Sequence, residues 1–379
     1  MSAEYRPPPT IPPLMLPWTP HRQATYQLMR AENIGTRTIA KIVERYPNLS
    51  LFLRKPMQWK DIGLTDAQTQ GLTASLNTAI EEDLAHMEKE GVQFLLPSDD
   101  AFPARLRQIP SPPAALFVRG APLEDTLAVA IVGTRKKTPY GERCATFFAS
   151  ELAHIGATIV SGLALGLDGV AHRATIEASG TTIAVVPGGI DDRSIVPQSH
   201  LPLAKRILDT RGTLCSERAP GATTFPFDYL HRNRLIAGLA DAVIVVEGDH
   251  DSGALVTARH ALEQGIEVLA IPGSIWSTAS RGTNALIRDG AVLCATMDDA
   301  LNALKLRDPH RAREAARTRE ILPASPEEAE VLALLDTPTL LDDLVRKSKK
   351  SPGVISGIVS VLEMKGRVIA VGPRTYARI

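Results

Sequence analysis

Five short apolar runs, each followed by a loop of glycine and small polar residues, limit what this chain can fold into more than any other feature. The runs are residues 128–132, 158–160, 182–186, 243–246 and 268–271. Continuous β-branched runs of this length predict strands that are buried on both faces. The helical patterns between them predict parallel crossovers. The fold class expected is therefore α/β, with a Rossmann-like parallel sheet at its core.

The loops that leave these strands are expected to share one edge of the sheet, because the carboxyl ends of parallel strands meet there and bind ligands. Glycine lets the backbone approach a ligand, and helix N-termini favour anions. This edge is therefore predicted to bind phosphate groups.

Composition narrows the class of protein. Forty-two basic and forty-two acidic residues give zero formal net charge, which argues against a general coat for nucleic acid but leaves room for a local basic track. No apolar stretch reaches the roughly 18 residues of a membrane helix. Since the start of the chain lacks a signal-peptide pattern, a cytoplasmic location is expected. Cys144, Cys215 and Cys294 have no metal or redox spacing and are expected to be apolar packing residues.

Patterning divides the chain into five segments. We predict a disordered proline-rich arm, a helical domain of helix–hairpin–helix or SAM-like type, the Rossmann-like domain, a linker and a winged-helix domain; their ranges are 1–20, 21–90, 91–305, 306–324 and 325–379. Within the Rossmann-like domain, residues 102–117 are expected to pack as an extended lead-in against the first strand. DNA contact by the helical domain and by the winged helix stays open, since both modules also serve packing or protein contacts.

The loop after the first strand contains Gly133, Thr134, Arg135 and Lys136. A guanidinium at Arg135 suits bidentate binding of phosphate, although pairing with a nearby carboxylate is the structural alternative. Thr138 is predicted to cap the next helix. The chain contains neither the dinucleotide fingerprint nor the Walker A motif, so ATP hydrolysis is not expected.

The loop after the second strand contains Ser161, Gly162 and Gly166, whose small side chains permit close approach of a backbone or a phosphate. Asp168, at the end of this loop, is expected to cap the following helix rather than to act in catalysis.

Arg232, Asn233 and Arg234 form the densest polar cluster of the core domain. Two arginines and an amide can hold phosphate and sugar or base, and the alternative is a buried ion-pair network with Glu217 or Glu247. Just upstream, three aromatic residues offer stacking faces for bases: Phe225, Phe227 and Tyr229.

The last two loops add hydroxyl, glycine and amide groups at Ser252, Gly253 and Asn284. In none of the loops does the sequence place a nucleophile beside a base, a metal-ligand cluster or an acid–base dyad. The expectation is a binding site without catalytic, metal or cofactor residues.

Taken in order, the loop motifs resemble those of the DNA-processing protein A (DprA/Smf) family. The matching strings are Ile131-Val132-Gly133-Thr134-Arg135, Ser161-Gly162-Leu163-Ala164-Leu165-Gly166-Leu167-Asp168, Arg232-Asn233-Arg234-Leu235-Ile236-Ala237-Gly238-Leu239, Ser252-Gly253-Ala254-Leu255-Val256-Thr257-Ala258, Ile271-Pro272-Gly273 and Gly282-Thr283-Asn284-Ala285-Leu286-Ile287. The family often has Tyr-Pro-x-x-Asn after the third strand, where this chain has Val196-Pro197-Gln198-Ser199-His200.

The resemblance implies a non-enzymatic homodimer that binds single-stranded DNA and loads RecA recombinase onto it, notably during natural transformation. It implies that Arg135 and its loop take phosphates and that residues 232–234 line the same groove. Lys205 is placed to reach the DNA backbone as well.

Two other functions remain as alternatives. Phosphoribohydrolases of the lysine-decarboxylase-like group share a Pro-Gly-Gly loop, but this chain continues with Ile190-Asp191-Asp192 instead of their x-Gly-Thr and glutamate. A transcription regulator would read duplex DNA with the winged helix and sense a nucleotide on the sheet.

Overall fold

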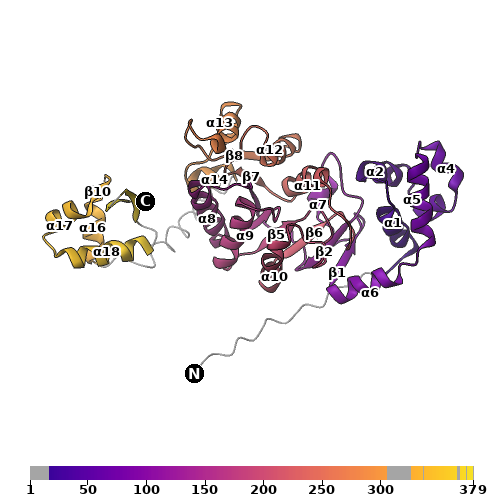
Figure 1. The fold of residues 1–379 in the computed structure, drawn as a ribbon, viewed down its shortest axis with the longest axis horizontal. Coiled ribbons are helices and arrows are strands. Elements are labelled where there is room, and N and C mark those ends of the chain that lie inside the picture. Colours follow the sequence, from indigo (N-terminus) through magenta and orange to yellow (C-terminus); the bar gives the residue numbers. More distant parts are fainter. Residues whose placement is uncertain (1–16, 305–325, 336, 365–367, 373, 379) are drawn as a thin grey trace, which may run out of the picture. The chain divides into compact units, whose positions relative to one another are not determined.

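The structure, a computed structural model, describes residues 17–304, 326–335, 337–364, 368–372 and 374–378 (Figure 1). It contains two compact units, Met1–Leu306 and Arg307–Ile379, and each is described by itself. The linker predicted at 306–324 and most of the predicted arm lie outside the described residues.

From Pro17, where the described residues begin, six helices precede the first strand. They are α1 (Pro20–Arg30), α2 (Thr36–Arg45), α3 (Leu49–Leu53), α4 (Pro56–Asp61), α5 (Asp66–Asn77) and α6 (Glu81–Glu90). Glycine and asparagine form the turns: Asn33 and Gly63 have left-handed φ angles of 61° and 78°. Leu28, Ile42, Phe52 and Leu72 lie in the core between the helices, so the predicted helical region is confirmed.

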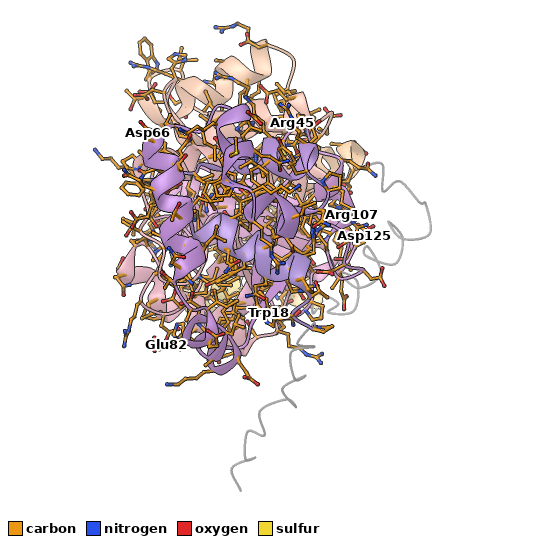
Figure 2. All side chains as sticks on the ribbon, turned by 90° about the vertical axis from the view of Figure 1, so that its right-hand side faces the viewer. Trp18, Arg45, Asp66, Glu82, Arg107 and Asp125 are labelled. Atoms are coloured by element: carbon orange, nitrogen blue, oxygen red, sulfur yellow. The ribbon has the colours of Figure 1, made fainter. Side chains whose placement is uncertain are left out.

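The end of the predicted arm belongs to the fold. Thr19 caps α1 by accepting a hydrogen bond from the backbone N–H of Arg22. The ring of Trp18, labelled in Figure 2, stacks on Phe94 at 5.6 Å between centroids. Residues 17–20 therefore belong to the folded unit, because the ring of Trp18 packs against the sheet.

A nine-stranded sheet forms the centre of the first unit (Figure 1). Its strands are β1 (Val92–Leu95), β2 (Leu116–Gly120), β3 (Ala128–Val132), β4 (Thr158–Ser161), β5 (Thr182–Val185), β6 (Thr213–Ser216), β7 (Ala242–Val245), β8 (Glu267–Ala270) and β9 (Val292–Leu293). Their order is β1-β2-β6-β5-β4-β3-β7-β8-β9. The run from β6 to β9 is parallel throughout, which confirms the predicted class.

Helices cover both faces of this sheet. They are α7 (Ala104–Arg107), α8 (Pro139–His154), α9 (Leu167–Glu177), α10 (Leu201–Asp209), α11 (Pro226–Gly238), α12 (Gly253–Glu263), α13 (Arg281–Arg288) and α14 (Met297–Ala303), with 3₁₀ turns η1 (Gln198–His200) and η2 (Thr278–Ser280). In β3, Ala130 packs into the core on one face, and Val129 and Ile131 pack into the core on the other. Burial on both faces explains the unbroken apolar runs.

The lead-in segment shares a hydrophobic core with the first strand, β3, as expected, but it is not extended throughout, because residues 104–107 form α7. Its strand β2 does not pair with β3 but lies antiparallel between β1 and β6, with Phe117 opposite Ser216. Both neighbours of β3 are parallel strands, β4 and β7, so no edge of β3 is free for it.

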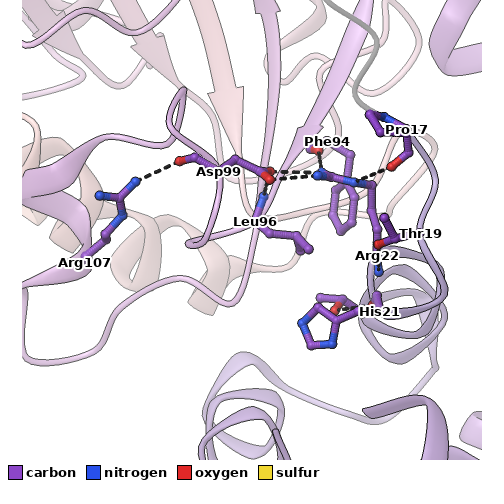
Figure 3. A network of polar contacts seen from close by, with 9 residues as sticks. Pro17, Thr19, His21, Arg22, Phe94, Leu96, Asp99 and Arg107 are labelled. Atoms are coloured by element: carbon purple, nitrogen blue, oxygen red, sulfur yellow. Dashed lines mark hydrogen bonds and ion pairs between the residues drawn. The ribbon is translucent and has the colours of Figure 1, made fainter. Parts of the chain in front are cut away.

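Arg22 on α1 joins the helical region to the sheet (Figure 3). Its buried guanidinium donates to the carbonyl of Phe94 at 2.5 Å and to both carboxylate oxygens of Asp99 at 3.0 and 2.8 Å. Asp99 in turn accepts from the backbone N–H of Leu96 at 2.6 Å. A buried bidentate pair with every partner hydrogen-bonded fixes the geometry between the two parts.

The second unit contains α16 (Pro326–Ala333), β10 (Thr339–Leu340), α17 (Leu341–Ser348), α18 (Pro352–Met364), β11 (Val368–Gly372) and β12 (Thr375–Arg378). Among the described residues of this unit, three helices followed by a β-hairpin give the predicted winged-helix order. The short strand β10, which pairs with β12, was not predicted. Leu344, Ile355 and Leu362 are fully buried in the core of this unit.

Within the described ranges, no helix combines the length and apolar composition that crossing a bilayer requires. The cytoplasmic location stays a prediction.

Candidate nucleic-acid interface

The order of the strands reverses around β3. The chain steps from β3 through β4 and β5 to β6 on one side, then crosses back to place β7 on the other side of β3. The carboxyl ends of strands at such a reversal form the ligand crevice of doubly wound sheets. Here the loops after β3, β4 and β7 meet at this point.

The carboxylate of Glu247, which follows β7, occupies the N-terminus of α8. It accepts hydrogen bonds from the hydroxyl of Thr138 at 2.6 Å and from the backbone N–H of Thr138 at 3.2 Å. Thr138 also caps α8 as predicted, accepting from the backbone N–H of Gly141 at 3.1 Å. Because the carboxylate of Glu247 is buried at the N-terminus of α8, it takes the position in which a nucleotide phosphate would meet this helix.

A second buried carboxylate, Asp168, fills the loop after β4. The prediction that it caps α9 is wrong, because Gly166 holds the cap position. Asp168 instead accepts from the backbone N–H of Gly162 at 3.0 Å. Burial raises the pKa of its carboxyl, against the opposing effects of Arg232 and the loop N–H groups.

Arg232 is buried beside Asp168. Its guanidinium donates to the carbonyl of Gly162 at 2.7 Å and to the carbonyl of Val185, and burial lowers its pKa to about 10. A Cβ at Gly162 would lie 2.6 Å from both Nη2 of Arg232 and Oδ2 of Asp168, so any larger residue here would displace this buried pair. Arg232 therefore ties the ends of β4 and β5 together.

Two histidines that sequence reasoning did not select hold the same loop. Nε2 of His172 accepts from the backbone N–H of Leu163 at 3.3 Å, and Nδ1 of His200 lies 2.9 Å from the Leu163 carbonyl. Leu163 has a left-handed φ of 54°, which these contacts stabilise. His200 takes the position of the asparagine in the motif Tyr-Pro-x-x-Asn. This difference from the motif was the sequence signal that could have identified His200 as a residue of the site.

Gly166 packs directly on the loop after β3. Its φ is 81°, and a Cβ there would lie 2.3 Å from the carbonyl oxygen of Thr134 and 2.6 Å from that of Arg135. Gly133 is similarly close to Leu167, with 2.4 Å between its ideal Cβ and a leucine methyl. The loops after β3 and β4 are therefore in direct contact, and this contact fixes the position of the Arg135 backbone.

Arg135 and Lys136 are exposed at this edge. The guanidinium of Arg135 lies over the ring of Tyr229 on α11, 4.7 Å from its centroid. Among the described residues it has no carboxylate partner, so the structural alternative of an ion pair is not realised there. A guanidinium that lies over an aromatic face can still donate from its N–H groups to an anion.

Two more aromatic rings lie at the start of α11. Phe225 and Phe227 are 47% and 65% exposed, and their rings are parallel, with centroids 5.8 Å apart. The rings of Phe225, Phe227 and Tyr229 therefore all lie at the N-terminal end of α11, and Tyr229 is the ring that Arg135 contacts. This combination of a cation and exposed rings is typical of single-strand binding grooves.

Other predicted residues are engaged within the protein. The Ser161 hydroxyl donates to the Ile131 carbonyl at 2.6 Å, and the Asn233 amide donates to the Gly253 carbonyl at 3.0 Å. Arg234 pairs with Glu217 at 2.6 Å, which is the structural alternative considered for this cluster. These side chains shape the edge from inside, so we do not retain them as direct contacts.

The remaining predicted residues lie around the edge. Ser252 caps α12, Gly253 is exposed at its first turn, and Asn284 holds the loop after β8. Lys205 on α10 is exposed and pairs with Asp192 at 2.9 Å. The structure brings Arg135 together with Tyr229 but shows no contact between Arg135 and Lys205.

In the described part of the chain, no three His, Cys, Asp or Glu side chains are grouped as metal ligands would be. Cys215 and Cys294 are buried and Cys144 is half-buried, all as free thiols.

Comparison with known families gives two matches. The model of the DNA recombination-mediator protein A family matches residues 93–305, and that of the DprA winged helix domain matches residues 314–372.

Curated relatives agree with these matches. The chain is 36% identical to protein Smf of Escherichia coli over 325 residues, which are 84% of this chain and 85% of that protein. It is 38% identical to DNA processing protein DprA of Bacillus subtilis over 227 residues, 59% of this chain and 75% of the relative.

Two solved structures are similar at 30% sequence identity. That of DNA processing protein A from Streptococcus pneumoniae has a TM-score of 0.64 and covers 74% of this chain and 97% of its own. That of the Helicobacter pylori protein, described for its single-stranded DNA binding mode, has a TM-score of 0.51 and covers 56% of this chain and 96% of its own.

Proposed function

The chain belongs to the DNA recombination-mediator protein A family, and on that premise we propose that it binds single-stranded DNA at the carboxyl edge of its sheet, without catalysis, and loads RecA onto the bound strand. The observation that carries the proposal is the exposed Arg135, whose guanidinium lies over the ring of Tyr229. Tyr229 is on α11, the helix that begins with the exposed rings of Phe225 and Phe227. The cation takes phosphate and the rings take bases.

Glu247 and Asp168 favour single-stranded DNA over a free nucleotide as the ligand. A mononucleotide at the strand reversal would need the N-terminus of α8 for its phosphate, and Glu247 already accepts from the N–H and hydroxyl of Thr138 there. This argues against the phosphoribohydrolase alternative. Phosphates are instead directed to the exposed side chains of Arg135 and Lys136.

The winged helix gives little support to the regulator alternative. Its third helix, α18, contains no lysine or arginine, and its only charged residue is Glu363. Readout of duplex DNA by such a helix relies on cationic or amide side chains that reach base edges and phosphates.

The test is the affinity of the full chain for a labelled oligo(dT), measured by fluorescence anisotropy, beside a duplex of equal length. Arg135→Ala should weaken single-strand binding about tenfold to a hundredfold, the value of a charge-assisted hydrogen bond. The loss should be equal for different base sequences, and the salt slope should fall by about 0.7. Unchanged affinity, or a loss that depends on base sequence, would contradict the proposal.

Arg288→Ala is the matched control. It removes the same charge from an exposed arginine at the far end of α13, where Arg288 pairs with Asp289 at 3.2 Å. Its affinity should equal that of the wild type.

A homodimer and RecA loading complete the proposal. Two grooves in one dimer raise the effective concentration of binding sites along a strand. Light scattering at working concentration should give twice the chain mass. RecA should displace a labelled single-strand-binding protein from DNA faster when the chain is present.

A further inference from the structure

The loop after β8 carries a tryptophan that the proposed groove has not yet used. Ile275 is 77% exposed and Trp276 is 88% exposed. The other two tryptophans differ, since Trp59 is buried and Trp18 is half-buried on Phe94. A large ring with this much exposed surface on a folded domain is typical of a binding site.

Hydrogen bonds hold this loop to the elements on either side of it. Asn284 on α13 accepts from the N–H of Gly273 at 3.2 Å and donates to its carbonyl at 3.1 Å. The N–H of Gly248 donates to the carbonyl of Ala279 at 2.7 Å. Held at both ends, the loop presents its apolar tip with little ordering left to be done on binding.

The loop lies on the same edge as Arg135. β8 is parallel to β7 and β7 to β3, so the ends of β3 and β8 are two strand spacings, about 10 Å, apart. Tyr140, on the helix that follows the Arg135 loop, donates from its hydroxyl to the carbonyl of Pro272 at 2.6 Å. Arg135 and the base of the tryptophan loop therefore belong to one connected surface.

Charge determines which part of a DNA strand can bind to this loop. Asp249 and the exposed Asp251 follow β7, between β3 and β8, and their carboxylates repel phosphates. Stacking of an uncharged base on a ring is not opposed in this way. Exposed Arg281, at the start of α13, offers the next cation along the edge.

We propose that Trp276 stacks on a base of the single strand whose phosphates Arg135 binds. The proposal rests on the proposed function and adds a second, base-contacting position to it. The two contacts differ in kind: the one at Arg135 depends on salt, and the one at Trp276 depends on the presence of bases.

The experiment compares the full wild-type chain with Trp276→Ala and Trp276→Phe, using oligo(dT) and an abasic oligodeoxynucleotide of equal length. Trp276→Ala should lose affinity for oligo(dT) by about fivefold to a hundredfold, with an unchanged salt slope. Trp276→Phe should retain most of the affinity, because it keeps an aromatic face. Neither variant should lower the melting temperature, since the side chain is almost fully exposed.

Tryptophan emission gives an independent readout. Oligo(dT) should quench the emission of the wild type, the abasic strand should not, and Trp276→Phe should lose the quenching while it still binds.

Oligo(dT) binding with no change in emission, together with full affinity in Trp276→Ala, would overturn the inference and leave the proposed function standing. A change of oligomeric state in Trp276→Ala with unchanged DNA affinity would also overturn it, by identifying a second copy as the occupant. Failure of the wild type to bind either strand would remove the proposed function and the inference with it.

Discussion

Glu247 and Asp168 place carboxylates at the two positions where a nucleotide-binding sheet would hold phosphate. Each is buried and hydrogen-bonded within the edge it fills. At the scale of single residues, hydrogen-bond donors inside the edge are therefore already used, and the side chains available to an external polyanion are the exposed ones, with Arg135 foremost.

Phe227 gives a second prediction at the level of a single residue. Phe227→Ala should lower the affinity for oligo(dT) by about 1–3 kcal/mol, the value of one stacked base, without changing the free energy of unfolding, because the ring is 65% exposed. Phe227→Leu keeps an apolar side chain without a flat ring and should lose nearly as much. Anisotropy titrations measure this, and equal affinity in all three proteins would remove Phe227 from the groove.

His172 predicts a pH dependence of stability. Burial, with His200 and Arg232 nearby, lowers its pKa from 6.5 to about 3 in the folded chain. Below pH 6.5 the unfolded chain therefore binds a proton that the folded chain does not, so stability falls by up to about 1.4 kcal/mol per pH unit as the pH drops.

Urea unfolding between pH 8 and pH 5 measures this. His172 contacts the Leu163 N–H at 3.3 Å and the Thr182 hydroxyl at 2.7 Å. His172→Gln can keep both hydrogen bonds but does not titrate, so it should show a shallower decline than the wild type. Identical slopes would mean that His172 is not protected from protonation.

At the scale of elements, the contact between the β3 and β4 loops is decisive. Gly166→Ala places a Cβ 2.3 Å from the Thr134 carbonyl on a residue with a φ of 81°, so the loop that carries Arg135 must shift. We expect a loss of about 1–3 kcal/mol in the free energy of unfolding and a lower affinity for single-stranded DNA.

Gly253→Ala is the matched control, because nothing lies within 4 Å of its ideal Cβ and its φ is not left-handed. Its melting temperature should be unchanged. Equal stability of the Gly166 variant would show that the two loops are not in contact.

At the scale of the whole molecule, the two units have separate cores. In the second unit, ion pairs within the domain reduce the basic excess, with Lys350 on Glu330 at 3.2 Å and Arg374 on Asp342 at 3.0 Å. Together with the absence of Lys and Arg from α18, this suits a contact with protein better than one with DNA.

A chain truncated after Leu306 should therefore fold with an unchanged main melting transition and bind oligo(dT) within about twofold of the full chain. Calorimetry and anisotropy measure both quantities. A tenfold loss of affinity would assign part of the DNA contact to residues 307–379.

The sequence by itself determined the parallel sheet, its five central strands, the helical and winged-helix regions, and the edge at which the glycine loops meet. These follow from local patterns: apolar runs, turn glycines and the cap at Thr138 act within a few residues of chain. Strand β6, with Thr, Cys and Ser among its four residues, lacks such a run and was missed.

Only the tertiary structure decided which polar residues face the solvent. Arg135 and Arg232 are equivalent in sequence terms, yet the first lies exposed on Tyr229 and the second is buried on carbonyls of Gly162 and Val185. The partners of Arg232 lie 47 and 70 residues away along the chain. Exposure of a polar side chain depends on such distant partners, whereas a strand or a cap depends on its neighbours. For that reason the edge and Arg135 were predictable, but the burial of Arg232 and Arg234 was not.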